Sequence, residues 1–233
     1  MLTPQRKRQI ENEAIRLRWD IWNERGKLWP GRHPHPLEVL NAQIAANILG
    51  YDLQYVPALS LPFSDTGGET AGVLDRPKKT ILVAECYGRE VRSFTSGHEL
   101  GHVVLHDQRV MHRDLPIRGL EQESTDPVER EANYFAGCYL MPPDFLARVF
   151  KDMFGAAPFT FDYAAASFLR PQDSGSLLYA PHGSLTRYRA LASARSYAVR
   201  AFGRSLAEMF QVSIATMAIR LRELDLVRHA VES

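Results

Sequence analysis

The chain has 233 residues, of which 45% are hydrophobic and 24% are charged, as is ordinary for a soluble globular protein of one or two domains. Lys and Arg number 28 against 27 Asp and Glu, so the net charge of +1 gives the whole chain no strong field toward nucleic acid or a membrane surface. The sequence has no run of about 18 apolar residues and no apolar segment behind its basic N-terminus. We therefore expect a cytoplasmic protein with no membrane partner.

Two helices are predicted before the first strand. The first covers residues 9–23, where four apolar residues recur at helical spacing with charges between them: Ile10, Ala14, Leu17 and Ile21. The second begins at Pro36, a residue favoured in the first turn of a helix, and ends at Gly50.

A small sheet is predicted next. A short strand at 52–57 precedes two apolar runs, 71–75 and 80–84, which a polar hairpin-like link joins. We expect these strands to lie beside the helix that follows. In that position the segment 71–84 is a candidate edge for binding an extended peptide, and a purely structural hairpin is the alternative.

The segment His98-Glu99-Leu100-Gly101-His102 carries the strongest functional signal in the chain. Two histidines four residues apart lie on one face of a helix, so both imidazoles can reach one Zn²⁺. The glutamate after the first histidine lies on the side where a zinc-bound water would sit. This pattern is typical of a zinc hydrolase with a glutamate as general base. The alternative is a buried helix whose His and Glu side chains make ordinary hydrogen bonds.

His106 continues the four-residue spacing but is a poor candidate for a third ligand. On an unbroken helix it would lie about 12 Å along the axis from His98, too far for one tetrahedral ion. We expect His106 to cap the end of the helix or to pack beside the site.

The third ligand is expected from a second helix, which Pro127 opens and Pro142 ends. Glu129 and Glu131 compete for this role, and they point in nearly opposite directions around the helix. Glu129 shares its face with the small and apolar residues that would pack on the His helix: Ala132, Ala136 and Leu140. The phase therefore favours Glu129, with Glu131 as second choice. Asn133, one turn further on, could orient Glu129 or a histidine.

The C-terminal segment 205–227 resembles a helix-turn-helix unit, with Ser213 capping its second helix. A DNA-reading helix would expose Thr216, Arg220 and Arg222 in a groove. The alternative is a packing module or a dock for a partner protein. DNA contact is possible, but it is not the favoured interpretation.

Two motifs together resemble the ImmA/IrrE family of metallopeptidases over roughly residues 36–150. These are Phe94-Thr95-x-x-His98-Glu99-Leu100-Gly101-His102-Val103-Val104-Leu105-His106 and Glu129-x-Glu131-Ala132-Asn133-x-Phe135-Ala136-x-x-x-Leu140-Met141-Pro142. The resemblance implies a gluzincin-like peptidase with one Zn²⁺ ion. It makes His98, His102 and Glu129 the ligands and Glu99 the base. Members of the family are similar in cleaving or binding helix-turn-helix repressors, which releases genes of mobile elements or stress responses.

These observations predict an α+β protein. Residues 1–155 would form a mainly helical zincin-like peptidase domain with a small β-sheet, and residues 156–233 a helical C-terminal module. Tyr134 and His106 are candidate donors to the oxyanion of the reaction, and the sequence does not choose between them.

The expected function is a zinc endopeptidase that cuts a repressor-type regulatory protein and so relieves transcriptional repression. Two alternatives stay open. One is a zinc-containing regulator that binds a transcription factor without cutting it, and the other is direct DNA binding through the C-terminal module.

Overall fold

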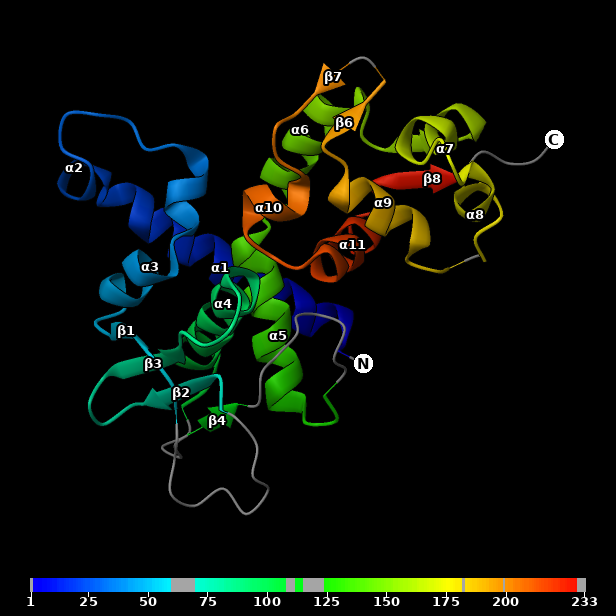
Figure 1. Ribbon diagram of the computed structural model, residues 1–233. Helices are drawn as coiled ribbons and strands as arrows, with labels where there is room; N and C mark the ends of the chain where they lie inside the picture. The colour runs from blue at the N-terminus through cyan, green and yellow to red at the C-terminus, as the bar shows by residue number, and fades with distance from the viewer. Residues whose placement is uncertain are drawn as a thin grey trace. The chain divides into compact units, whose positions relative to one another are not determined.

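The computed structural model describes residues 2–59, 70–107, 112–114, 124–181, 183–198 and 200–229. The chain divides into two compact units, Met1–Leu140 and Met141–Ser233. Figure 1 colours the first from blue to green and the second from green to red. Among the described residues, no helix combines the length and the apolar character needed to cross a bilayer.

The first unit opens with the long helix α1 (Pro4–Asn23), which starts before the predicted residue 9. Thr3 caps it, since its side chain accepts a hydrogen bond from the Arg6 N–H, and Pro4 occupies the first turn. The four apolar residues at helical spacing are buried, as predicted. The one-turn helix α2 (Arg25–Leu28) follows.

The second predicted helix is in fact two pieces, the 3-10 helix η1 (Pro36–Leu40) and α3 (Ala42–Ile48). Asn41 separates them because its backbone is extended and its side-chain oxygen accepts from the N–H groups of Gln43 and Ile44. The apolar spacing runs through both pieces, so it did not reveal that Asn41 ends one helix and caps the next.

A four-stranded sheet contains β1 (Asp52–Val56), β2 (Gly72–Asp75), β3 (Thr80–Ala84) and β4 (His112–Asp114) in the order β1-β3-β2-β4. The predicted hairpin is confirmed, since β2 and β3 pair antiparallel. On its other side β3 pairs with β1, and β2 pairs with β4. Neither strand of the segment 71–84 is therefore a sheet edge, and the purely structural interpretation of this hairpin fits the sheet.

The two helices with the sequence motifs cross closely. The first, α4 (Arg89–Leu105), packs on β2, β3 and α3, and most tightly on α5 (Pro127–Leu140). At the crossing, a Cβ atom on Gly101 would lie 2.9 Å from the Cα of Ala132. A glycine is required there because the backbone of α5 occupies the space of a side chain. This close approach brings the polar residues of the two helices within reach of one another.

The second unit begins with α6 (Pro143–Phe154). The boundary between the units therefore precedes this helix, whereas the sequence placed it after residue 155. Aromatic contacts explain the difference, because Phe150 and Phe154 of α6 pack against Phe159, and Phe154 also contacts Tyr197 and Phe202. The remaining elements up to the last helix pair are β5 (Phe159–Phe161), α7 (Tyr163–Leu169), α8 (Ser174–Leu178), α9 (Thr186–Ser193), β6 (Ser196–Tyr197) and β7 (Arg200–Ala201).

The segment that resembles a helix-turn-helix forms α10 (Leu206–Phe210) and α11 (Ile214–Glu223), and β8 (Val227–His229) follows. The turn contains Gln211, whose φ of 54° is left-handed. Thr216 and Arg220 were predicted to be exposed for docking, but their side chains are 0% and 1% exposed, and only Arg222 of the three is at the surface.

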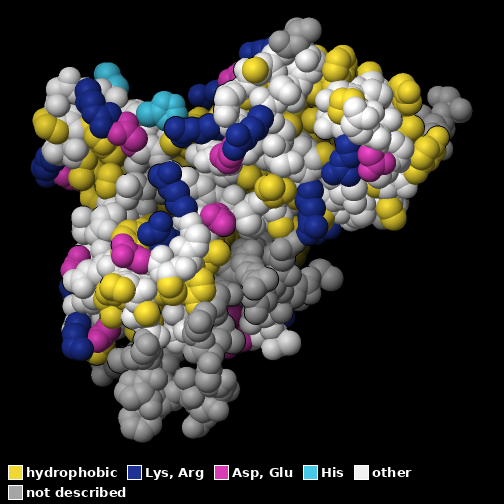
Figure 2. Space-filling view, in the orientation of Figure 1, with side chains coloured by type: hydrophobic (Ala, Val, Ile, Leu, Met, Phe, Trp, Pro, Cys, Tyr) yellow, Lys and Arg dark blue, Asp and Glu magenta, His cyan; other side chains and the backbone are white. Residues whose placement is uncertain are grey.

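Contacts within the second unit explain why Arg220 is buried. Arg220 donates to the carbonyl oxygen of Met141 and pairs with Glu223, so its charge is used inside the unit. On the face drawn in Figure 2, Lys and Arg side chains are interspersed with Asp and Glu side chains. Two of the three residues that were predicted to contact DNA are therefore buried.

Candidate metal centre

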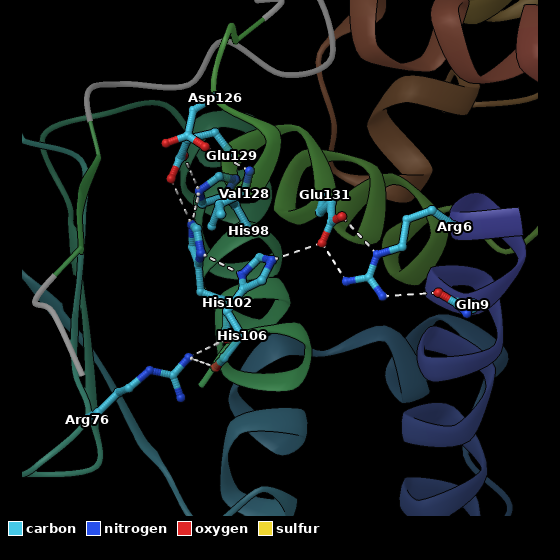
Figure 3. A network of polar contacts seen from close by, with 10 residues as sticks. All are labelled: Arg6, Gln9, Arg76, His98, His102, His106, Asp126, Val128, Glu129 and Glu131. Carbon is cyan, nitrogen blue, oxygen red and sulfur yellow. Dashed lines mark hydrogen bonds and ion pairs between the residues drawn. The ribbon is translucent and has the colours of Figure 1, made fainter. Parts of the chain in front are cut away.

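Three predicted side chains from two helices meet in the first unit. The Nε2 atoms of His98 and His102 on α4 lie 2.8 Å apart, as expected for neighbours on one helix face. Glu129, in the first turn of α5, places one carboxylate oxygen 3.2 Å from Nε2 of His98 and the other 3.4 Å from Nε2 of His102 (Figure 3). The two imidazoles are completely buried, and the carboxylate is partly exposed.

This donor set fits a zinc ion. A tetrahedral ion with ligand bonds of about 2.0–2.1 Å holds its ligand atoms roughly 3.3 Å apart, close to the separations in the cluster. Two imidazole nitrogens and one carboxylate oxygen are a common set for catalytic zinc, and they leave one coordination position for water or substrate. His98, His102 and Glu129 could therefore hold one metal ion.

The local charges favour the ionised form of Glu129. Burial alone would raise the pKa of this carboxyl group, but hydrogen bonds and charge interactions with His102 and His98 outweigh it and lower the pKa below the ordinary range. A metal ligand must be deprotonated, and the ionised carboxylate is the form of Glu129 that can bind a cation.

Asn133 contacts one of the two imidazoles. Its side-chain oxygen lies 2.9 Å from Nδ1 of His98, one turn along α5 from Glu129. With the proton of His98 on Nδ1 and donated to Asn133, the lone pair of Nε2 is directed at the cluster. Of the two roles predicted for Asn133, the structure places it on a histidine rather than on Glu129.

Glu99 lies completely buried on α4, pressed against the backbone of β2. A Cβ atom on Gly72 would come within 2.2 Å of the Glu99 carboxylate and 2.7 Å of the Thr95 methyl group. Only a glycine in β2 leaves room for the Glu99 side chain in this position. Sequence patterns do not predict this contact, because the close approach joins residues 27 positions apart in a strand and a helix.

The second-choice ligand, Glu131, is directed away from the cluster. Its carboxylate receives two hydrogen bonds from the guanidinium group of Arg6 on α1, at 2.8 and 2.5 Å. The hydrogen bond from Arg6 is the main reason that the pKa of Glu131 lies below its ordinary value. The phase argument thus separates the two glutamates correctly in space, while the role of each as a ligand stays a prediction.

The two candidate oxyanion donors have other partners. The Tyr134 hydroxyl donates to a carboxylate oxygen of Glu11 at 2.5 Å. His106 ends α4, and its ring nitrogens lie 3.1 Å from Nδ1 of His102 and 3.2 Å from Glu131. These contacts do not fit a donor that faces a substrate. They agree with the prediction that His106 caps the helix and packs beside the site.

Arg76 is a further residue that the sequence analysis missed. It lies in the link between β2 and β3, and its guanidinium group donates to the backbone carbonyls of His102 and His106 at the end of α4 (Figure 3). A cation at the C-terminal end of a helix interacts favourably with the helix dipole, and here it gives the His102 carbonyl a second donor beside the N–H of His106. No spacing rule connects a hairpin residue with a helix terminus, so only the folded structure reveals this contact.

The comparison with known families agrees with this geometry. Residues 57–156 match the model of a peptidase family that is described as the IrrE N-terminal-like domain. The matched range includes α4, α5 and all four residues of interest, namely His98, Glu99, His102 and Glu129. The matched domain and the cluster of His98, His102 and Glu129 together support a metallopeptidase.

More particularly, residues 57–156 are similar to the IrrE N-terminal-like domain of this peptidase family, in agreement with the resemblance seen in the two motifs. Among curated proteins, none matches the chain.

Proposed function

We propose that the protein is a zinc-dependent endopeptidase that cleaves a repressor-type regulatory protein and so relieves transcriptional repression. The cluster of His98, His102 and Glu129 supports the chemistry most directly. Glu99 lies on α4, the same helix as the two histidines. The regulatory substrate is inferred from the family, whose members are similar in acting on helix-turn-helix repressors.

Each residue of the site has its own role in the proposed reaction. The two histidines and Glu129 would hold a zinc ion, which would supply Lewis acidity when bound. Glu99 accepts the proton of the attacking water and returns it to the leaving amine. Asn133 keeps the His98 imidazole in the tautomer that binds metal.

The binding regulator is the main alternative. A protein that only binds its partner would need the fold, and it could use the metal for stability, but it would have no use for a general base. Glu99 is present in the motif, and the β2 backbone leaves room for its side chain at Gly72. This observation favours the peptidase over the regulator that does not cut.

A first experiment measures metal content by elemental analysis and peptide cleavage by mass spectrometry. The wild type, Glu99→Gln and His98→Ala would be compared, each incubated with purified helix-turn-helix repressors encoded beside the gene. We expect one equivalent of zinc in the wild type and in Glu99→Gln, cleavage by the wild type alone, and neither zinc nor cleavage in His98→Ala.

Two results would contradict the proposal. Cleavage by Glu99→Gln would remove Glu99 from the mechanism. A zinc-loaded wild type that forms a stable complex with a repressor but leaves it intact would support the binding regulator instead.

A further inference from the structure

A line of polar side chains leads from the metal cluster to the N-terminal helix. Nδ1 of His102 lies 3.1 Å from Nδ1 of His106, and Nε2 of His106 lies 3.2 Å from the carboxylate of Glu131. Arg6 of α1 then holds the same carboxylate through two hydrogen bonds (Figure 3). Three elements thus contribute in turn, α4, α5 and α1.

The donor and the acceptor of each hydrogen bond can be assigned by starting from Arg6. Arg6 is a cation that only donates, so the Glu131 carboxylate accepts from it. An ionised carboxylate also accepts from Nε2–H of His106, which makes Nδ1 of a neutral His106 an acceptor. With both imidazoles neutral, as metal binding by His102 requires, the proton of His102 then lies on its Nδ1 and is donated to His106. This tautomer directs the Nε2 lone pair of His102 toward Glu129 and His98.

We propose that His106, Glu131 and Arg6 are positioning residues of the metal centre, which orient His102 as Asn133 orients His98. The inference rests on the proposed function in one respect, namely that His102 binds zinc. It adds that the metal centre extends to α1, a helix that lies outside the matched range 57–156. The N-terminal helix is thereby part of the peptidase site.

Burial and geometry separate this arrangement from an ordinary surface ion pair. The side chains of His106 and Glu131 are 7% and 17% exposed, so solvent screens their contact little. The Arg6 guanidinium meets Glu131 through Nε and a terminal nitrogen, a two-point contact that fixes where the carboxylate lies. A fixed carboxylate restricts the ring of His106, and through it the ring of His102.

The test measures zinc affinity by competition with a coloured chelator and uses no peptide substrate. We expect His106→Ala and Glu131→Ala each to weaken zinc binding about 10- to 100-fold, the range typical of groups that hydrogen-bond to metal ligands. Arg6→Ala should weaken it less, and Arg6→Lys should restore part of the loss. The matched control is Glu38→Ala, because Glu38 also forms a two-point pair with an arginine, Arg32, but does so in η1. This control should bind zinc like the wild type.

A double variant distinguishes a line of contacts from general destabilisation. If Glu131 acts through His106, then His106→Ala combined with Glu131→Ala should bind zinc about as tightly as His106→Ala alone. Two independent losses of stability would instead add. The visible absorption of the cobalt-loaded protein gives a second readout, since a reoriented His102 changes the geometry around the ion in Glu131→Ala but not in Glu38→Ala.

The outcomes also separate this inference from the proposed function. A wild type that binds no zinc would overturn the proposed function. A wild type that binds zinc tightly, with unchanged affinity and cobalt spectrum in His106→Ala and Glu131→Ala, would overturn the role of these residues and leave the peptidase intact.

Discussion

Glu129 and Glu131 have different partners although they lie only two positions apart on one helix. Both are acidic residues in the same turn of α5, yet one meets the two histidines and the other meets Arg6. The sequence separates them because residues two apart on a helix point in nearly opposite directions. The partner of Glu131 is beyond such reasoning, since Arg6 is 125 residues away in the chain.

A first prediction concerns Gly72, the residue against which Glu99 packs. Gly72→Ala would place a methyl group 2.2 Å from the Glu99 carboxylate, so this proposed general base must move. A shift of about 1 Å in a reacting group can cost roughly 100-fold in rate. We expect kcat on a cleaved repressor to fall by about that factor while the zinc content stays at the wild-type level.

The control for Gly72→Ala is Gly26→Ala, since a Cβ atom on Gly26 of α2 would meet nothing within 4 Å. This variant should cleave at the wild-type rate. Unchanged kcat in Gly72→Ala would mean that Glu99 does not occupy this position during the reaction.

A second prediction concerns acid stability and the Arg6–Glu131 pair. The pKa of Glu131 in the folded protein lies below its ordinary value of 4.5, first because of the hydrogen bond from Arg6. A carboxyl group with a lowered pKa stabilises the fold above its ordinary pKa, and this contribution is lost as the pH falls below about 4.5. We expect the melting temperature of metal-free Glu131→Gln to fall less than that of the wild type between about pH 6 and 3.

Circular dichroism at a series of pH values measures this difference. If the melting temperature fell by the same amount in both proteins, the pKa of Glu131 would be the same in the folded and unfolded states.

At the scale of elements, the crossing of α4 and α5 creates the site. Ligands from two helices can share one ion only if the helices approach closely, and small residues allow this approach. Gly101 faces the backbone of Ala132, while Gly97 faces the side chain of Leu140. The motif spacing and the small face of α5 predicted this crossing, because both are local patterns with a helical period.

A third prediction compares these two glycines. In Gly101→Ala the new methyl group meets backbone atoms of Ala132 at 2.9 and 3.0 Å, so the helices must separate. In Gly97→Ala it meets the end of the Leu140 side chain at 3.1 Å, which can rotate. We expect Gly101→Ala to lower the free energy of unfolding by about 1–3 kcal/mol and to weaken zinc binding.

Denaturant unfolding of the metal-free proteins tests the comparison. Gly97→Ala should cost clearly less than Gly101→Ala, and the reverse order would show that the crossing is not limited by the backbone contact at Ala132.

A fourth prediction concerns α11. Arg220 is buried and donates to Met141, so Arg220→Ala should leave polar groups without their partner and lower the free energy of unfolding by about 1–3 kcal/mol. Exposed Arg222 is the matched control, and Arg222→Ala should change stability by less than about 0.5 kcal/mol. Thermal unfolding measures both. An Arg220→Ala variant of wild-type stability that lost affinity for DNA in a salt-dependent way would instead restore the DNA-binding interpretation.

At the scale of the whole molecule, the sequence predicted the α+β class, the His helix, the Glu helix and the β2–β3 hairpin. It did so because each has a local signature in spacing or end residues. The division by contacts after Leu140 differs from the predicted boundary after residue 155, because α6 is grouped with the second unit by aromatic pairs distant in sequence, such as Phe145 with Phe210. The sequence missed Arg6, Arg76 and Gly72 around the site for the same reason.

A fifth prediction follows from the division into two units. All three candidate ligands lie in the first unit, Met1–Leu140. Zinc at about 100 times its dissociation constant should stabilise the structure that binds it by roughly 2.7 kcal/mol. We expect zinc to slow amide hydrogen exchange in α4 and α5 and to leave α9 and α11 unchanged. His98→Ala is the control, and equal protection in both units would show that the ion acts on more than its own unit.

The packing of α1 on α5 affects where the ends of an expressed fragment should be placed. A fragment cloned to the boundaries of the matched domain, residues 57–156, would lack α1 and its four buried apolar residues. It would also lack Arg18, which donates to the carbonyl oxygen of Cys138, as well as Glu11 and Arg6. One face of the helix that carries Glu129 would then be open to water. An inactive or insoluble fragment of this kind would reflect the choice of boundaries, and a purification tag is better placed away from the first turn of α1.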